Sequence, residues 1–414
     1  MMRASFRAGA ALTLVVLHAA LAGAQSLSQR GFVDASALLF PATTPTDSVR
    51  AVGDLRVRDE VFVSASSWLR LAAGVEARAN SHAQVDTRWR LDADDRGLRR
   101  PALSLRRATA TITRGPLTLD LGRQFIRWGK ADIVTPTDRF APRDFINVVS
   151  SEFLGVSGAR AVVQRGADTL DVAWVPRLTP SRMPLLDQRW TVRPPSAAGL
   201  TLKPAPAVLP TRDQVGVRWG RVMDGYEWSA SVYDGVNHMP NVASVPGASL
   251  REVWLVRSYP RLRMYGADVA VPTRWATLKG ETALVRSPDG QSDEYLLYVV
   301  QAERQTGEWN LLAGYAGEWV TTRRVAQTFA PDRGLTKSVV ARASYTVDAN
   351  RSAALETAVR QTGRGVYLKG EFSQARGAHW RATVAGVAIA GRSDDFLGQY
   401  RRNSNISLAL RYSF

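Results

Sequence analysis

Charged and aromatic side chains are concentrated in residues 122–145, which read GRQFIRWGKADIVTPTDRFAPRDF. The guanidinium, ammonium, carboxylate and indole groups that could do chemistry here belong to Arg123, Arg127, Trp128, Lys130, Asp132, Asp138, Arg139, Arg143 and Asp144. Guanidinium groups bind carboxylates and phosphates in a bidentate manner, so this segment suits either anion binding or internal ion pairing. Its near balance of basic and acidic residues favours internal pairing, with the aromatic rings packed against another surface.

This segment belongs to a longer interruption, residues 124–155, between stretches that alternate as β-strands do. Pro136 and Pro142, with the neighbouring Asp138 and Asp144, favour turns and short capped helices over extended chain. Two placements remain open. The loop either folds into the space enclosed by the strands, where it would narrow or plug a channel, or packs as a cap on the outside of the strands.

The sequence contains few other residues or motifs that are typical of a catalytic or metal site. His82, His238 and His379 are scattered, and the chain contains no cysteine. It also lacks a G-x-S-x-G motif and a glycine-rich phosphate loop. We therefore predict no metal, no cofactor and no enzymatic activity. A hydrolase whose serine and histidine meet only in the folded chain is a less favoured alternative.

The first 24 residues have the pattern of a secretory signal peptide. Arg3 and Arg7 precede an apolar run over residues 8–21, and Ala-Gly-Ala at 22–24 fits the cleavage rule. An N-terminal membrane anchor is the alternative, but this run is shorter than the roughly 20 residues that a helical span needs. Residues 25–414 show no linker and are predicted to form one domain.

The net charge of +17 comes mainly from arginine. Nucleic acid is a common partner of basic proteins. The export signal and the absence of a clustered basic run argue against it here. The proline-rich residues 176–210 are bracketed by strands and are predicted to form a long loop.

The C-terminal residues 405–414, NISLALRYSF, alternate strictly. Apolar Ile406, Leu408 and Leu410 lead to Tyr412 and Phe414, while the intervening residues are polar or small. About ten alternating residues match a tilted transmembrane β-strand. The terminal Tyr412 and Phe414 resemble the assembly signal of outer-membrane barrels, which implies the barrel-assembly machinery as a partner. A final strand of a soluble sandwich is the alternative.

Similar alternation recurs along the chain. Residues 308–320 place Trp309 and Trp319 at the two ends of one apolar face, as in two aromatic girdles with lipid between them. Short turns are predicted at 114–116, 165–168, 223–225, 306–307, 348–350 and 376–378, and long connections at 124–155, 176–210, 237–257, 321–334 and 391–402. The predicted fold is all-β: a transmembrane antiparallel up-and-down β-barrel of 16–18 strands.

The alternation also predicts which charged residues face the interior of this barrel. They are Arg70, Arg88, Arg90, Arg218, Lys279, Glu281, Arg342, Arg360, Arg381 and Arg411, with residues 85–91 taken as one of the strands. These charges either pair with one another across strands in a wet interior or form a mildly anion-selective pore.

The pattern L-G-R-Q-x-x-x-W-G-K-A-D-x-x-x-P-T-D at residues 121–138 resembles a segment of porin-like outer-membrane barrels loosely related to alginate-export barrels. The resemblance implies a diffusion channel in the bacterial outer membrane, with lipid around it and a polyanion or an amphipathic carboxylate as conceivable cargo. We therefore expect passive passage of small solutes, with a mild preference for anionic ones. A closed barrel that binds partners through its loops is the alternative.

Overall fold

The computed structural model describes residues 26–324, 329–361 and 364–414. The predicted signal peptide lies outside these residues. Among them, no helix has both the length and the apolar character of a helical membrane span.

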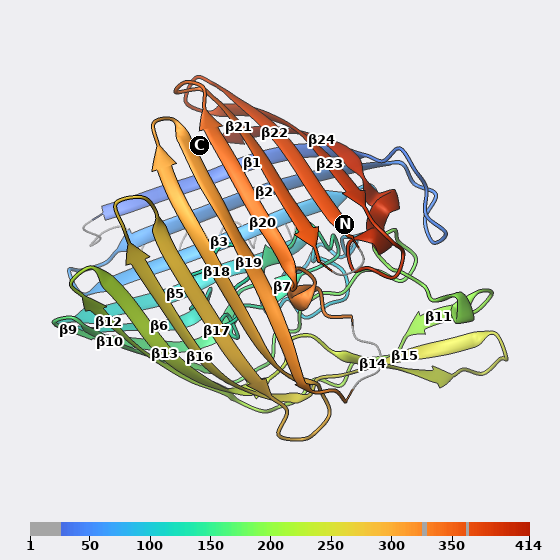
Figure 1. The fold of residues 1–414 in the computed structure, drawn as a ribbon, viewed down its shortest axis with the longest axis horizontal. Helices are drawn as coiled ribbons and strands as arrows, with labels where there is room; N and C mark the ends of the chain where they lie inside the picture. Colours follow the sequence, from blue (N-terminus) through green and yellow to red (C-terminus); the bar gives the residue numbers. More distant parts are fainter. Residues whose placement is uncertain (1–25, 325–328, 362–363) are drawn as a thin grey trace, which may run out of the picture.

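Eighteen antiparallel strands form one closed wall (Figure 1). In order around the wall they are β1 (Ser26–Leu39), β2 (Ala51–Ser64), β3 (Leu69–Asn80), β5 (Leu103–Arg114), β6 (Leu117–Gln124), β9 (Val156–Arg165), β10 (Asp168–Val175), β12 (Gln214–Met223), β13 (Tyr226–Val236), β16 (Arg261–Pro272), β17 (Thr277–Arg286), β18 (Glu294–Thr306), β19 (Trp309–Thr322), β20 (Ser338–Thr346), β21 (Arg351–Arg360), β22 (Val366–Arg376), β23 (Trp380–Ala390) and β24 (Asn405–Ser413).

The remaining elements are short and lie in the connections. They are β4 (Leu91–Asp92), β7 (Arg143–Asp144), β8 (Glu152–Phe153), β11 (Thr201–Pro204), β14 (Asn241–Pro246) and β15 (Glu252–Ser258), with the 3₁₀ turns η1 (Pro195–Ala197), η2 (Pro331–Arg333) and η3 (Gly398–Asn403). β11, β15 and β14 form a small separate sheet beyond the rim of the barrel (Figure 1).

The barrel closes where β1 pairs with β24. Phe32 lies opposite Ser413 in this seam, and beyond it Gly31 and Phe414 exchange two backbone hydrogen bonds of 2.9 and 3.0 Å. A Cβ atom on Gly31 would lie 2.5 Å from the ring of Phe414, so this aromatic ring is seated directly on the glycine. The C-terminal residues predicted as an assembly signal thus complete the seam. Recognition by the assembly machinery stays a prediction.

The outer face of the wall is apolar and bounded by aromatic rings. Trp219 contacts Trp228, Trp309 contacts Tyr345, and Trp380 contacts Tyr412, with ring centroids 4.8, 4.7 and 5.0 Å apart, all near the short turns. At the other end of β19, Trp319 is 70% exposed. Closure leaves no unpaired strand edge in lipid, which satisfies the requirement for crossing a membrane. The predicted outer-membrane barrel is confirmed, with eighteen strands.

The predicted hairpin turns are confirmed at one end of the barrel, and the predicted long connections lie at the other. Residues 325–328 of the predicted 321–334 connection lie outside the described residues. Gly166 and Gly307 adopt φ angles of +58° and +54°, which residues with a Cβ atom adopt at a cost. In outer-membrane barrels the short turns face the periplasm and the long loops face the outside.

The prediction of a wall strand over residues 85–91 is wrong. β3 pairs directly with β5, so no wall strand fits between them, and residues 81–102 form an extracellular connection. Arg88 and Arg90 lie exposed in this connection instead of facing the interior from the wall. The alternating residues 85–91 include Trp89, which is 72% exposed in this connection and is not part of the wall.

The 125–155 connection folds into the barrel, which decides between its two predicted placements. Trp128 and Phe140 are buried and meet edge to face, with ring centroids 5.2 Å apart, and Phe140 meets Tyr233 of β13 at 5.0 Å. Gly216 on β12 makes room for them, because a Cβ atom there would lie 2.5 Å from Trp128 and 2.7 Å from Phe140. We call residues 125–155 the inward loop.

Replacing Gly216 with valine should undock the inward loop while leaving the wall intact. Overpacking of this kind costs about 1–3 kcal/mol. We expect tryptic cleavage within the loop, at Arg127 or Lys130, to accelerate at least tenfold in limited proteolysis of the refolded barrel. Gly220→Val is the matched control, because a Cβ atom on Gly220 makes only ordinary contacts of 3.5 Å. Equal cleavage rates in the two variants would contradict this docking role.

Candidate pore constriction

The inward loop is held on the wall by the carboxylate of Glu281 on β17. Its two oxygens accept hydrogen bonds from the backbone N–H groups of Lys130, Ala131 and Thr137 at 2.9, 2.9 and 2.8 Å, and from the Thr137 hydroxyl at 2.8 Å. Glu281 is 3% exposed. A buried carboxylate with four donors is well satisfied, and these bonds fix two turns of the loop at one point.

A second contact with the same wall involves Asp132 of the loop. Its carboxylate lies 2.9 Å from the Lys279 ammonium and accepts a 2.6 Å hydrogen bond from Gln301, whose own oxygen accepts the Asp132 backbone N–H. These two hydrogen bonds lower the pKa of Asp132, although burial alone would raise it. Asp132 therefore stays ionised and attached.

Within the loop, Asp138 ties the two halves together. It accepts the backbone N–H groups of Trp128 and Gly129 at 2.6 and 2.7 Å and the Nε–H of Arg127 at 3.2 Å. The internal pairing expected from the balanced charges thus exists, although much of it runs through backbone donors.

At its far end the inward loop reaches the opposite side of the barrel. Glu152 lies 2.7 Å from Arg56 and 3.8 Å from Arg58 on β2, and 3.9 Å from Arg78 on β3. Burial would raise the pKa of Glu152, but the charges of Arg78 and Arg56 outweigh it and lower the pKa to about 2. Because Glu281 and Glu152 contact opposite walls, the loop spans the lumen.

Three extracellular connections meet at Asp144 of the inward loop. Its oxygens lie 2.8 Å from Arg100 of the 81–102 connection and 2.8 Å from Arg182 of the 176–213 connection. Arg182 also pairs with Asp95. Burial lowers the pKa of Arg182 to about 10, which leaves it charged at neutral pH. Breaking one member of such a buried network would leave uncompensated charge, so the connections hold one another in place.

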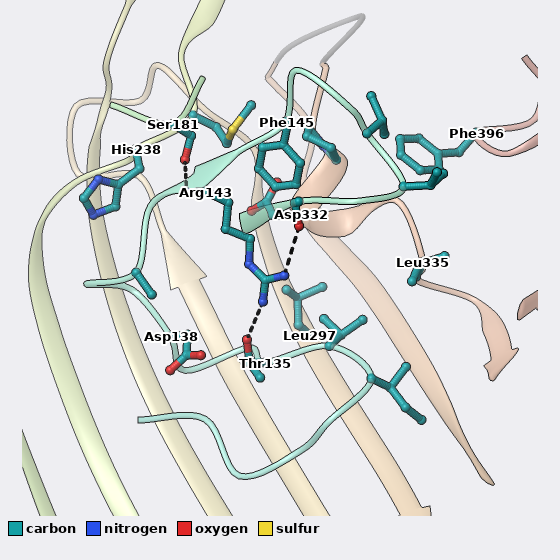
Figure 2. Close-up of a pocket in the computed structure, with 18 of the residues that line it drawn as sticks. Thr135, Asp138, Arg143, Phe145, Ser181, His238, Leu297, Asp332, Leu335 and Phe396 are labelled. Atoms are coloured by element: carbon teal, nitrogen blue, oxygen red, sulfur yellow. Dashed lines mark hydrogen bonds between the residues drawn. The ribbon is translucent and has the colours of Figure 1, made fainter. Parts of the chain in front are cut away.

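A cavity of about 240 Å³ lies between the inward loop and the wall, and Arg143 extends into it (Figure 2). The guanidinium donates to the hydroxyls of Thr135 and Ser151, both at 3.4 Å, and lies 4.1 Å from the centroid of the Phe153 ring. Within the described residues, no carboxylate oxygen lies within 4 Å of it. Burial lowers the pKa of Arg143 and outweighs the opposite effect of the Asp138 and Asp332 carboxylates.

Further arginines face the lumen from β5. A β-bulge opposite Gly74 places both Arg106 and Arg107 on the inner face, each near the ring of Phe125, at 5.2 and 5.9 Å. The Nε atom of Arg107, like that of Arg123 on β6, is buried without a hydrogen-bond partner. This wall therefore carries guanidinium groups with unused donors.

The charged residues predicted to face the lumen are placed by the structure as follows. Inward positions on the wall are held by Arg70, Arg218, Lys279, Glu281, Arg342, Arg360, Arg381 and Arg411. Several of them have partners: Arg411 pairs with Asp34 at 2.7 Å and Arg218 with Asp268 at 3.1 Å. Arg360 lies 2.9 Å from Asp395 in the last extracellular connection. Arg218, Arg360 and Arg411 thus hold strands and loops together.

Two groups of residues in this region were not singled out from the sequence. The adjacent Arg106 and Arg107 interrupt the alternation of β5, and such a doubled charge is the signal that could have indicated a bulge. Glu152 stands close to the end of the loop with nothing in its neighbourhood to predict its three arginine partners.

The three histidines of the described residues contact structural groups. His82 lies 2.7 Å from Asp47, His379 lies 2.7 Å from the backbone oxygen of Ser413, and His238 lies 2.6 and 2.9 Å from the backbone oxygens of Thr179 and Arg139. Burial lowers the pKa of His238 to about 4. Its ring lies between backbone oxygens of two other connections near the cavity, and in the neutral form it can donate to one of them at a time.

Solved structures of similar fold are outer-membrane porins. A BenF-like porin from Pseudomonas fluorescens Pf-5 aligns with a TM-score of 0.57 at 8% identity, over 95% of this chain and 99% of that one. OccAB4 from Acinetobacter baumannii gives 0.56 at 8%, over 94% and 98%, and OpdQ from Pseudomonas aeruginosa gives 0.53 at 9%, over 94% and 97%. No protein-family model and no curated protein matches the sequence.

At this identity the likeness establishes the fold. It supports the porin-like barrel expected from the sequence, in the bacterial outer membrane. The resemblance to alginate-export barrels stays a prediction.

Removing the Glu281 carboxylate should release the inward loop. Hydrogen bonds to a charged group contribute about 1.5–3 kcal/mol each, but the contributions of neighbouring bonds are not additive. Glu281→Ala should therefore reduce the free energy of loop docking by roughly 3 kcal/mol. Tryptic cleavage of the loop should then rise on the order of a hundredfold, with the thermal unfolding of the wall nearly unchanged. Glu371→Ala, which removes an inward carboxylate paired with Lys369 at 2.8 Å, should leave the loop protected. Equal protection in both variants would refute the anchoring role.

The attachment of Glu152 should withstand acid. Its pKa in the folded protein is about 2, against an ordinary 4.5, so its stabilising effect is complete above about pH 4.5 and disappears as the pH falls towards 2. We expect the single-channel current to be steady from pH 7 to about 4 and to become noisy below that. Glu152→Gln should already be noisy at pH 7 and change little on acidification. A wild-type transition near pH 4.5 or above would contradict this assignment.

Proposed function

We propose that this protein is a channel through which small anionic solutes cross the outer membrane passively. The inward loop spans its lumen, and arginine side chains lie both on this loop, at Arg143, and on the wall, at Arg106 and Arg107. Rings or rows of arginine favour anions in channels.

The proposal rests on the burial and the hydrogen-bond partners of Arg143. It is a largely buried cation facing a cavity, its hydrogen bonds are long, and its partners are neutral hydroxyls. Most other charges of the inward loop have acidic or basic partners. No carboxylate of the described residues pairs with this guanidinium, and only the more distant charges of Asp138 and Asp332 offset its burial. Such a cation is costly unless an anion visits it.

The lining of the cavity indicates what kind of anion fits. Phe145 and Phe396 line it together with Leu297 and Leu335 (Figure 2). The acidic residues Asp138, Asp332 and Glu356 also line it. A solute with one anionic group and an apolar body would satisfy both Arg143 and this lining. An amphipathic carboxylate has this chemistry, and its carboxylate suits the planar guanidinium.

A larger cavity of about 770 Å³ opens among the extracellular connections. Arg88, Arg99, Arg193 and Arg257 contribute to its lining. In the proposed route, solutes gather in this vestibule, pass the arginines of the inward loop and of β5, and leave through the periplasmic half of the lumen. Each contact is brief because water and hydroxyl groups compete for the same donors.

Ion selectivity tests the proposal. In planar bilayers under a salt gradient, the reversal potential should show anion preference, and Arg143→Gln should weaken it. One unit charge at 4 Å is worth about 1 kcal/mol in a watery medium, so the anion-to-cation permeability ratio should fall about fivefold. Arg376→Gln, which removes an exposed arginine at the periplasmic turn of β22, should have no effect.

Two outcomes would overturn the proposal. A barrel that conducts no current, even after removal of residues 125–153, would indicate a closed barrel that binds partners through its loops. Equal selectivity in wild type and Arg143→Gln would remove the role of Arg143 while leaving a channel.

A further inference from the structure

The outer surface of the barrel changes abruptly from apolar to charged along strands β13, β16 and β17. Val232, Tyr265 and Leu284 lie in register on neighbouring strands and face outward. The next outward-facing row lies two positions nearer the extracellular loops. It consists of Asp234, Arg263 and Arg286, again in register. In a membrane barrel such a boundary marks the level of the lipid headgroups.

Two arginines of this row lie directly opposite each other. Arg263 on β16 is the cross-strand partner of Arg286 on β17. Like charges in this position are destabilising unless an anion lies between them. On the other side of Arg263 the neighbour is Asp234, whose carboxylate lies 2.6 Å from its guanidinium.

Asp234 pairs with more guanidinium groups than its single negative charge can neutralise. Arg212 lies 2.6 Å and Arg261 lies 3.1 Å from it, in addition to Arg263. Three guanidinium groups therefore share one carboxylate, and their side chains remain 43%, 35% and 41% exposed. The neighbouring Asp289 is engaged with the backbone N–H groups of Arg261 and Gln291.

The same excess of cations continues one strand further. Glu294 at the start of β18 is shared by Arg286 at 2.8 Å and Arg324 at 3.4 Å, and both arginines are partly exposed. Asp213, also at this level, accepts the indole N–H of Trp174 at 3.1 Å. We call Arg212, Arg261, Arg263, Arg286 and Arg324 the rim arginines.

We propose that the rim arginines bind the phosphate groups of the phosphorylated glycolipid in the outer leaflet, the lipid A part of lipopolysaccharide. They face outward, at the extracellular end, immediately above an apolar row that contacts acyl chains. Exposed guanidinium groups with spare donors match phosphate oxygens in geometry and charge. This site lies outside the lumen and does not depend on the proposed transport function.

Binding of lipid A to the refolded barrel in nonionic detergent tests this proposal. Native mass spectrometry should show lipid A with its phosphates binding at least tenfold more tightly than dephosphorylated lipid A. The triple variant Arg212→Gln/Arg261→Gln/Arg263→Gln should bind both lipids within twofold of each other. Arg221→Gln is the matched control, because Arg221 is equally exposed and faces outward at the periplasmic end, 3.7 Å from Asp168. It should keep the tenfold preference.

Two controls separate the possible outcomes. Inorganic phosphate at the same phosphate concentration should not displace the lipid, and displacement would indicate a site for free phosphate and overturn the lipid assignment. Heat-modifiable migration and single-channel conductance should be unchanged in the triple variant, which shows that the barrel has folded. Equal binding of the two lipids by wild type, or an undiminished preference in a folded triple variant, would overturn the proposal.

Discussion

The hydrogen bonds between β1 and β24 close the sheet on itself, and the rest of the structure depends on this closure. A strand edge exposed to lipid would leave a row of N–H and C=O groups unpaired, at several kcal/mol each. Closure removes both edges and makes the wall rigid. A rigid wall can then present single side chains, such as Glu281 and Gly216, as fixed docking points for a loop inside.

The inward loop uses opposite chemistry at its two ends. Towards β12 and β13 it buries Trp128 and Phe140 against a glycine, so this contact depends on close packing of apolar groups. Towards β2 and β3 it places Glu152 among three arginines, so charge decides the contact. A loop held on both sides of the lumen cannot swing freely. The uncompensated Arg143 between these anchors is therefore kept at a defined position, which is what selective passage requires.

Charge is distributed differently on the two faces of the wall. Inside, many arginines of the strands have carboxylate partners, whereas Arg106 and Arg107 of β5 have none within ion-pair distance among the described residues. Outside, arginines occur with too few carboxylates at one level of the extracellular rim. The same residue type thus appears in three settings: it holds strands together, it faces the solute path, and it faces the lipid headgroups. Arginine suits all three because it remains charged at any physiological pH and makes several directed hydrogen bonds.

Much of the fold was predictable because its signals are local. Period-two alternation identified the strands of the wall, and glycine, asparagine and aspartate identified the hairpin turns. The error over residues 85–91 shows the limit of this reasoning. Alternation in a short segment does not reveal whether a neighbouring strand has room to pair with it, and here β3 and β5 already pair with each other.

The sequence by itself determined that the chain is a β-barrel of the outer membrane, that one end carries short turns, and that residues 124–155 cannot be part of the wall. Only the tertiary structure decided where that loop lies and which charges stay unpaired. The reason is distance along the chain: the Glu281 carboxylate meets backbone donors about 150 residues away, at Ala131 and Thr137. Arg143 and Arg139 look alike in the sequence. Arg139 lies 3.8 Å from Asp332, whereas the pairing of Arg143 is decided by the cavity that forms when the loop folds inward.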